Sequence, residues 1–302
     1  MRVTRAVAKV PGSCGELAQG LIDGNHFLVS CPIDMYATAS VEVSAWSGRV
    51  CAPMDSPKAR QSVEQTLKHF GRSDLDVNLS LSSTLPRGKG MASSTADVSA
   101  SIAATAAALG ESDAMPPSEI ARLSLMVEPS DGLMLPGISL IDHRHGTTAR
   151  TIGEAPPMRV VVLDFGGGVD TLEFNNVDRE DTLRELQPRF EEALAMIVRG
   201  IEDGRAEDVA AGATLSAVAN QHVLFKPQLE AVMKQAEELG ALGVNVAHSG
   251  TIIGMLFDDD FALAESAVSH LRDGTLGVRQ IYDRRVVNGG ACLVEDAVLW
   301  QP

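Results

Sequence analysis

The sequence has 302 residues, of which 45% are hydrophobic and 4% aromatic, and its formal net charge is −15. This length predicts two domains of roughly 150 residues each, with cores built from small aliphatic side chains. The acidic balance argues against a broad nucleic-acid or anionic-membrane surface, and a polyanionic ligand would need local help from Lys, Arg, helix termini or metal.

Apolar periodicity predicts an α+β first half. Residues 2–10 alternate apolar and polar side chains as a strand and end at a glycine-punctuated polar turn, 11–20. An alanine-rich helix is expected to end before Gly110, a typical C′ residue. We further expect strands at 26–30, 36–45 and 76–82, helices at 57–70 and 118–127 with Ser118 as the N-cap of the second, and a strand or hairpin at 137–150.

The second half starts after a Gly- and Pro-containing linker at 153–157, and it is also predicted to be α+β. A compact apolar run at 158–165 has the length and β-branching of a buried strand. We also expect helices at 179–200, 205–219, 227–240 and 260–272, a strand–turn–strand unit at 243–257, and strands at 278–287 and 291–299.

Cysteine content and hydropathy indicate the compartment. Cys14, Cys31, Cys51 and Cys292 form no C-x-x-C pair, so reduced thiols are expected. No segment has the apolar core of a signal peptide or the length of a membrane span. We therefore expect a cytoplasmic protein without nucleic-acid or membrane partners, present as a monomer or homodimer.

Gly88 and Gly90 predict a tight loop that leads into the N-terminus of the alanine-rich helix. Ser93 or Ser94 is a good N-cap, and the spacing Ser94-x-x-Asp97 fits a capping box. The free N–H groups and the dipole of such a helix end suit a phosphate. Taken alone, however, this pattern is more often a plain connection.

The polar segment 11–20 also contains candidate ligand-binding residues. Ser13 and Cys14 stand between glycines, and Glu16 follows. Backbone N–H groups there can bind an amino-acid carboxylate, and Glu16 can bind an ammonium group. The alternative is a hairpin turn with the start of a helix, in which Cys14 is a small packed residue.

The segment 128–131 and the basic trio 143–145 carry further candidates. Glu128 and Asp131 can supply carboxylate oxygens of the kind Mg²⁺ takes together with phosphates and water, although a surface turn has the same composition. His143, Arg144 and His145 can face a phosphate or a carboxylate, or can form a solvated hairpin tip.

The run PRGKGMASSTA at 86–96 resembles the second motif of the GHMP small-molecule kinases, P-x-G-x-G-L-G-S-S-A-A, with departures at Met91, Ala92 and Thr95. Residues 11–20 and 247–254 resemble the first and third motifs, in the correct order. The resemblance implies a ribosomal-protein-fold-like N-terminal domain at 1–153 and a ferredoxin-like C-terminal domain at 158–302.

The resemblance also implies roles for individual residues. It implies Ser94 and Glu128 as Mg²⁺ ligands, and it places Asp131 near the acceptor hydroxyl as a general base or orienting group. The residues implied to bind ATP are Pro86, Arg87, Gly88, Lys89, Gly90, Met91, Ala92, Ser93, Ser94 and Thr95. Those implied to bind the substrate are Ser13, Cys14, Gly15, Glu16, Ser249, Gly250 and Thr251.

Four runs carry a closer similarity within the family: PGSCGELAQG at 11–20, KGMASSTAD at 89–97, EPSDGLML at 128–135 and DHRHG at 142–146. Together they are most similar to the members that phosphorylate L-threonine. This similarity implies ATP- and Mg²⁺-dependent phosphorylation of the threonine side-chain hydroxyl to O-phospho-L-threonine, for cobalamin synthesis or salvage. A homoserine kinase or another small-alcohol kinase of the family is the alternative. A non-catalytic nucleotide or amino-acid sensor is a further one, which the presence of Ser94, Glu128 and Asp131 disfavours.

Overall fold

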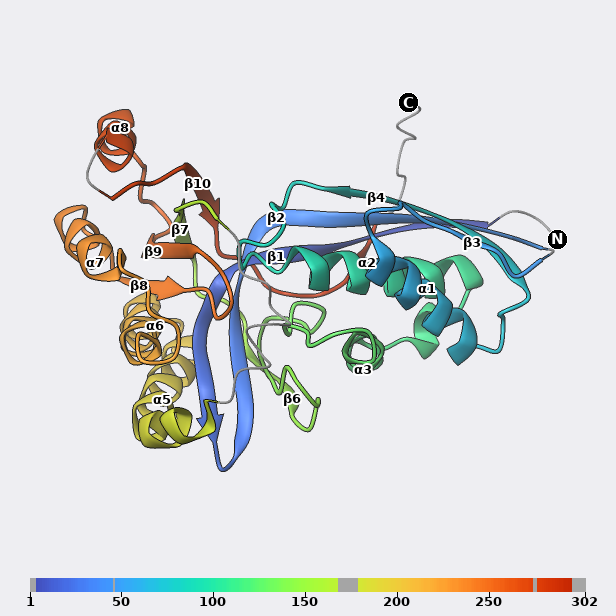
Figure 1. Cartoon of the computed structure of the whole chain (residues 1–302), viewed down its shortest axis with the longest axis horizontal. Coiled ribbons are helices and arrows are strands. Elements are labelled where there is room, and N and C mark those ends of the chain that lie inside the picture. The colour runs from blue at the N-terminus through green and yellow to red at the C-terminus, as the bar shows by residue number, and fades with distance from the viewer. Residues whose placement is uncertain (1–3, 46, 168–178, 274–275, 295–302) are drawn as a thin grey trace.

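Figure 1 shows the computed structural model of the chain, which describes residues 4–45, 47–167, 179–273 and 276–294. Within these residues, no helix is both long and apolar enough to cross a membrane. The four cysteines are free thiols, as expected.

Two long antiparallel strands, β1 (Thr4–Ile22) and β2 (Asn25–Ala45), run from the right-hand end of the molecule to its middle and then bend toward α5 (Glu180–Glu202) (Figure 1). The turn expected at 11–20 is therefore wrong, because this segment lies within β1. Register shifts between Pro11 and Ala18 accommodate its glycines. Such bulges bend a strand and redirect its side chains, so the polar motif can face a site without leaving the sheet.

One sheet runs through the whole chain. The antiparallel pairing of Glu16 in β1 with Val246 joins the strands of the two halves. The strand order is β10 (Gln280–Arg285), β7 (Met158–Asp164), β9 (Ile252–Asp258), β8 (Gly243–Val246), β1, β2, β4 (Leu75–Ser83) and β3 (Val50–Cys51). A hairpin of β5 (Ile138–Ile141) and β6 (Ala149–Gly153) pairs with β2 through β5, and β11 (Cys292–Leu293) pairs with β1.

Helices cover the sheet in two groups (Figure 1). In the first half, α2 contacts β1, β2, α1 and α3. In the second half, α6 contacts β8, and α7 contacts β8 and β9. The first group is α1 (Pro57–His69), α2 (Ser93–Leu109), the short η1 (Ser112–Ala114) and α3 (Pro117–Leu125); the second is α5 (Glu180–Glu202), α6 (Ala206–Asn220), α7 (Leu229–Glu238) and α8 (Glu265–Asp273).

Helix α2 is the central helix of the first half. Small side chains such as Ala100, Ala104 and Ser101 are fully buried, so the helix can approach the sheet closely while α1 and α3 pack on its other sides. Gly110 ends it at φ 79°, the left-handed C-cap expected from the sequence.

Several predicted helix starts are wrong. The N-cap of α2 is Ala92, at φ 52°, without a side-chain cap hydrogen bond, so neither a Ser93 or Ser94 cap nor the capping box forms. The N-cap of α3 is Pro116, which leaves Ser118 inside the helix. Helix α8 begins at Glu265 rather than 260.

The last part of the chain returns to the first half. Ile33 forms a β-bridge with Val286, and β11 pairs with β1. Of the strand expected at 291–299, Cys292 and Leu293 are extended, and residues 295–299 lie outside the described residues. The division into domains of 1–153 and 158–302 stays a prediction. Residues 286–293 belong to the second predicted domain but pair with strands of the first.

Candidate active site

The glycine loop at the start of α2 is held by backbone hydrogen bonds from two distant segments. The N–H groups of Ser13 and Gly15 donate to the carbonyls of Met91 (3.2 Å) and Gly90 (3.3 Å). The N–H group of Thr251 donates to the carbonyl of Lys89 (3.0 Å). The three segments singled out in the sequence therefore meet at one point of the fold.

Close packing explains the glycines at this junction. A Cβ atom on Gly250 would lie 2.2 Å from the carbonyl oxygen of Lys89, and one on Gly15 would lie 2.6 Å from the backbone of Val246 and Ala247. Gly88 and Gly90 have φ values of 70° and 84°, which suit glycine.

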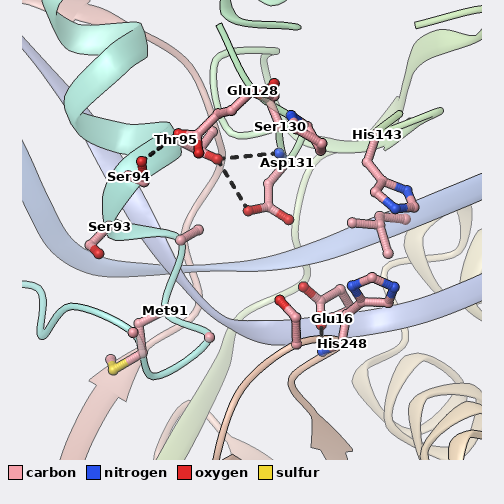
Figure 2. A pocket seen from close by; sticks show the side chains of 16 residues that line it. Glu16, Met91, Ser93, Ser94, Thr95, Glu128, Ser130, Asp131, His143 and His248 are labelled. Atoms are coloured by element: carbon pink, nitrogen blue, oxygen red, sulfur yellow. Dashed lines mark hydrogen bonds between the residues drawn. The ribbon is translucent and has the colours of Figure 1, made fainter. Parts of the chain in front are cut away.

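A first cavity opens beside the N-terminus of α2 (Figure 2). It brings together residues from the glycine loop, the loop after α3, the hairpin after β5, strand β1 and the turn after β8. The lining residues are Glu16, Leu28, Gly88, Gly90, Met91, Ala92, Ser93, Ser94, Thr95, Glu128, Pro129, Ser130, Asp131, His143, His248 and Ser249.

Ser94 and Glu128 form one polar pair at the rim of this cavity. The Ser94 hydroxyl donates to Oε1 of Glu128, and the Lys58 ammonium group forms an ion pair with Oε2 of the same carboxylate. The Ser94 and Glu128 oxygens are hard donors of the kind that Mg²⁺ prefers. Among the described residues, no group of three or more His, Cys, Asp or Glu side chains is arranged to hold a metal by itself.

Asp131 lines the same cavity, next to Thr95. The Thr95 hydroxyl is 3.4 Å from Oδ2 of Asp131 and also 3.4 Å from its backbone nitrogen. Burial, together with the negative charge of Glu128, raises the pKa of the Asp131 carboxyl to about 6. A buried carboxylate with such a pKa can accept a proton near neutral pH.

Glu16 lies on the opposite wall and projects from the bent part of β1 (Figure 2). Its Oε2 accepts a hydrogen bond from the backbone N–H of His248. Burial, followed by the charge of Asp131, raises the pKa of Glu16 well above its ordinary value. Two carboxyl groups facing one small cavity favour a cation between them.

Four predicted substrate-binding residues lie beneath the glycine loop instead of in the cavity: Ser13, Gly15, Gly250 and Thr251. The N–H groups of Ser13 and Gly15 are bonded to the loop, so they do not offer the carboxylate site that the sequence suggested. These residues support the loop, whereas Ser249 does line the cavity.

Cys14 also lies outside the cavity. Its thiol is buried, 3.7 Å from Oδ1 of Asn245, and burial raises its pKa well above the ordinary value. A protonated, enclosed thiol fits the packed role considered from the sequence and does not fit substrate binding.

Three predicted ATP-binding residues do not line the first cavity: Pro86, Arg87 and Lys89. Arg87 instead reaches the start of α1, where its guanidinium donates to the carbonyl of Asp55 (2.8 Å) and the hydroxyl of Ser56 (3.0 Å). It lines a second cavity of about 450 Å³ on the other side of the α2 N-terminus, together with Lys58 and Asp97 among others.

Lys89 points into the second half of the chain. Its ammonium group lies 3.2 Å from Oδ2 of the buried Asp164 and donates to the carbonyl of Gly167 (2.7 Å). Oδ1 of Asp164 also accepts from Gly166 N–H (2.8 Å) and from the Thr251 hydroxyl (3.3 Å). Lys89 thus ties the loop to β7 and is not aimed at a phosphate.

We expect Lys89→Met to lower the free energy of unfolding by about 1–3 kcal/mol, because Asp164 would keep a buried charge without its cation. Urea unfolding measures this loss. Lys68→Met, at an exposed lysine of α1, is the matched control and should stay within about 0.5 kcal/mol of the parent. Unchanged stability with weaker ATP affinity would show that Lys89 contacts the nucleotide instead.

The basic trio separates into buried and exposed members. His143 is 3% exposed and lines the first cavity, so the solvated hairpin tip does not hold for this residue. His145 is exposed and Arg144 is half-buried. The sequence pattern did not predict two further lining residues: Lys58 of the second cavity, which follows a helix-starting proline, and His248 of the first cavity, which lies within the segment 247–254.

Comparison with known proteins assigns the class. The family model "GHMP kinases N terminal domain" matches residues 58–136, and "GHMP kinases C terminal" matches residues 191–273. Together with the relatives below, these matches show that the chain belongs to the GHMP kinase family.

The curated relatives are more specific. The chain is 33% identical over 258 residues to an L-threonine kinase of Salmonella typhimurium, covering 84% of this chain and 83% of that protein. It is 34% identical to an L-threonine kinase of Citrobacter freundii, covering 84% and 86%. A crystal structure of homoserine kinase from Cytophaga hutchinsonii shares the fold with a TM-score of 0.71 at 16% identity, covering 96% of this chain and 97% of that one.

Proposed function

We propose that this protein is an ATP-dependent L-threonine kinase, which transfers the γ-phosphoryl group to the side-chain hydroxyl and forms O-phospho-L-threonine and ADP. The observation that carries the proposal is the cavity at the α2 N-terminus, which joins Ser94–Glu128 to Asp131 and Glu16. The identity to L-threonine kinases over 84% of the chain supports the acceptor.

The nucleotide phosphates would lie against the glycine loop and the first turn of α2. Free N–H groups and the helix dipole favour negative charge at this end. Ser94 and Glu128 would hold the magnesium ion that the family implies, and their adjacent oxygens suit it. Such an ion neutralises charge on the phosphates. The second cavity, which shares Gly88 and Ser93 with the first, is the place we assign to the nucleoside.

The acceptor would occupy the space between Asp131 and Glu16. Asp131 would take the proton from the threonine hydroxyl as that oxygen attacks phosphorus, and the bond from the γ-phosphorus to the bridging oxygen of ADP would break. Glu16 would hold the α-ammonium group on the opposite wall. Burial raises the pKa of both carboxyls, and an ammonium group bound beside them would favour their charged forms.

A screen of amino acids and small alcohols by ADP release tests the proposal. We expect the highest kcat/KM with L-threonine and values about 10- to 200-fold lower with L-serine, which lacks one methyl group. A higher kcat/KM with L-homoserine would assign a homoserine kinase. The absence of turnover with every acceptor would favour the sensor.

The physiological setting is part of the same proposal. The resemblance to threonine-phosphorylating members implies a cytoplasmic enzyme of cobalamin synthesis or salvage that acts as a monomer or homodimer. Growth of a deletion strain on cobalamin precursors, with and without added O-phospho-L-threonine, tests that setting.

A further inference from the structure

His143 is a buried imidazole that the proposed chemistry does not use. Its ring packs edge to face against that of His248, which also lines the first cavity, with 5.0 Å between the ring centroids (Figure 2). Neither Nδ1 nor Nε2 of His143 has a hydrogen-bond partner among the described residues, although both atoms are buried. Buried polar side chains in native proteins nearly always have partners, so this ring is prepared for a ligand.

The backbone around His143 is rigidly held. Asp142, which is 2% exposed, accepts hydrogen bonds from the N–H groups of Arg144 (3.0 Å), His145 (3.1 Å) and Thr147 (3.2 Å). The carbonyl of His143 also accepts from the N–H of Ser130 (3.0 Å), next to Asp131. The backbone of His143 is therefore fixed relative to the segment that carries the carboxylate proposed as the base.

Carboxyl groups and imidazole rings line the first cavity together. Asp131 and Glu16 contribute the carboxyl groups from opposite walls. Burial first, and then the charges of Arg144 and neighbouring imidazoles, lower the pKa of His143 and His248. A neutral imidazole keeps one ring N–H, which can donate a hydrogen bond to an anion.

The space behind the ring cannot take the ligand. His143 and His248 also line an inner cavity, with Gln19 and Asn220 among its other residues, but that cavity measures about 20 Å³. This volume is close to that of one water molecule. A ligand that pairs with His143 must therefore lie on the side of the first cavity.

We propose that His143 binds the α-carboxylate of the acceptor amino acid through a ring N–H group, while Glu16 takes the ammonium group and Asp131 the hydroxyl. The inference rests on the proposed function and extends it. His143 would then be the residue that distinguishes an amino acid from an amino alcohol, because an acceptor without the carboxylate leaves the imidazole unpaired.

Replacing His143 tests the proposal from the protein side. We expect His143→Leu to raise the KM for L-threonine about tenfold to 100-fold, because a hydrogen bond to a charged group is lost, while the affinity for ATP is kept. His143→Gln retains an N–H donor and should recover part of the loss. His145→Gln, two residues away and exposed, is the matched control and should leave the KM unchanged. Thermal unfolding confirms that each variant is folded.

A second experiment changes the acceptor instead of the protein. It uses (R)-1-amino-2-propanol, which is L-threonine without its carboxylate. Its kcat/KM should be equal in wild type and His143→Leu, whereas the kcat/KM for L-threonine falls. Unchanged kinetics with L-threonine in both His143 variants, or an equal loss for the two acceptors, would overturn the assignment. Failure of the proposed function is a different result, because the wild type itself would then not phosphorylate L-threonine.

Discussion

Asp131→Asn is expected to lower kcat by about 10²- to 10⁴-fold while nucleotide affinity changes little, because a positioned general base contributes that much to proton transfer. The carboxyl group lies within the cavity, beside Thr95 and close enough to Glu128 for that charge to raise its pKa. Steady-state kinetics with L-threonine, together with binding of an ATP analogue, separate the two effects.

The competing view gives Asp131 a different task. If the γ-phosphate itself accepts the proton, Asp131 would only hold the substrate ammonium group. Asp131→Asn would then raise the KM for L-threonine at a nearly normal kcat, and that outcome contradicts its assignment as the base.

The pH profile provides a second readout of the same residue. Burial raises the pKa of Asp131 to about 6, so the carboxylate form prevails above this pH and the protonated form below it. The wild-type kcat/KM should fall at least about tenfold per pH unit below pH 6. The decline should be shallower in Asp131→Asn, in which Glu16 is the remaining cavity carboxyl with a raised pKa. Stability moves the other way: a carboxyl whose pKa is raised by folding stabilises the fold at low pH and loses that contribution as pH rises through about 6. At neutral pH, the free energy of unfolding of Asp131→Asn should therefore be equal to or higher than that of the wild type.

Glu128→Gln is expected to lower kcat by at least about 10²-fold and to raise the Mg²⁺ concentration needed for half-maximal activity. The physical reason is the loss of a charged oxygen ligand from the pair that Ser94 and Glu128 form. Ser94→Ala removes the other oxygen and should shift the metal requirement in the same direction.

A matched control separates this effect from a general loss of negative charge. Glu119 on α3 pairs with Arg122, away from the first cavity, so Glu119→Gln should keep the wild-type Mg²⁺ dependence. Normal metal dependence and a near-normal kcat in Glu128→Gln and Ser94→Ala would remove both residues from the metal site.

Much of the fold was predictable from local patterns. Apolar side chains at helical spacing, Val63, Leu67 and Phe70, predict the helix at 57–70, and α1 spans Pro57–His69. The alternation and β-branching of the strands at 76–82 and 158–165 likewise predicted β4 and β7. These elements form because their own side chains match the period of a helix or strand.

Features set by distant parts of the chain were not predictable. The loop residue Lys89 resembles a phosphate ligand locally, but its partner Asp164 lies 75 positions further along the chain. Residues 11–20 resemble a turn, yet pairing with β2 keeps them extended. His143 follows the hairpin strand β5, and only the fold shows that it is buried against His248.

The most direct test of the central claim is a competition between acceptors, with product identity as the readout. The protein is incubated with Mg·ATP and equal concentrations of L-threonine, L-serine and L-homoserine, and the products are identified by ³¹P NMR and mass spectrometry. We predict O-phospho-L-threonine as the main phosphorylated product, in amounts equal to the ADP formed. O-phospho-L-homoserine as the main product, or ADP without any phosphorylated amino acid, would contradict the account.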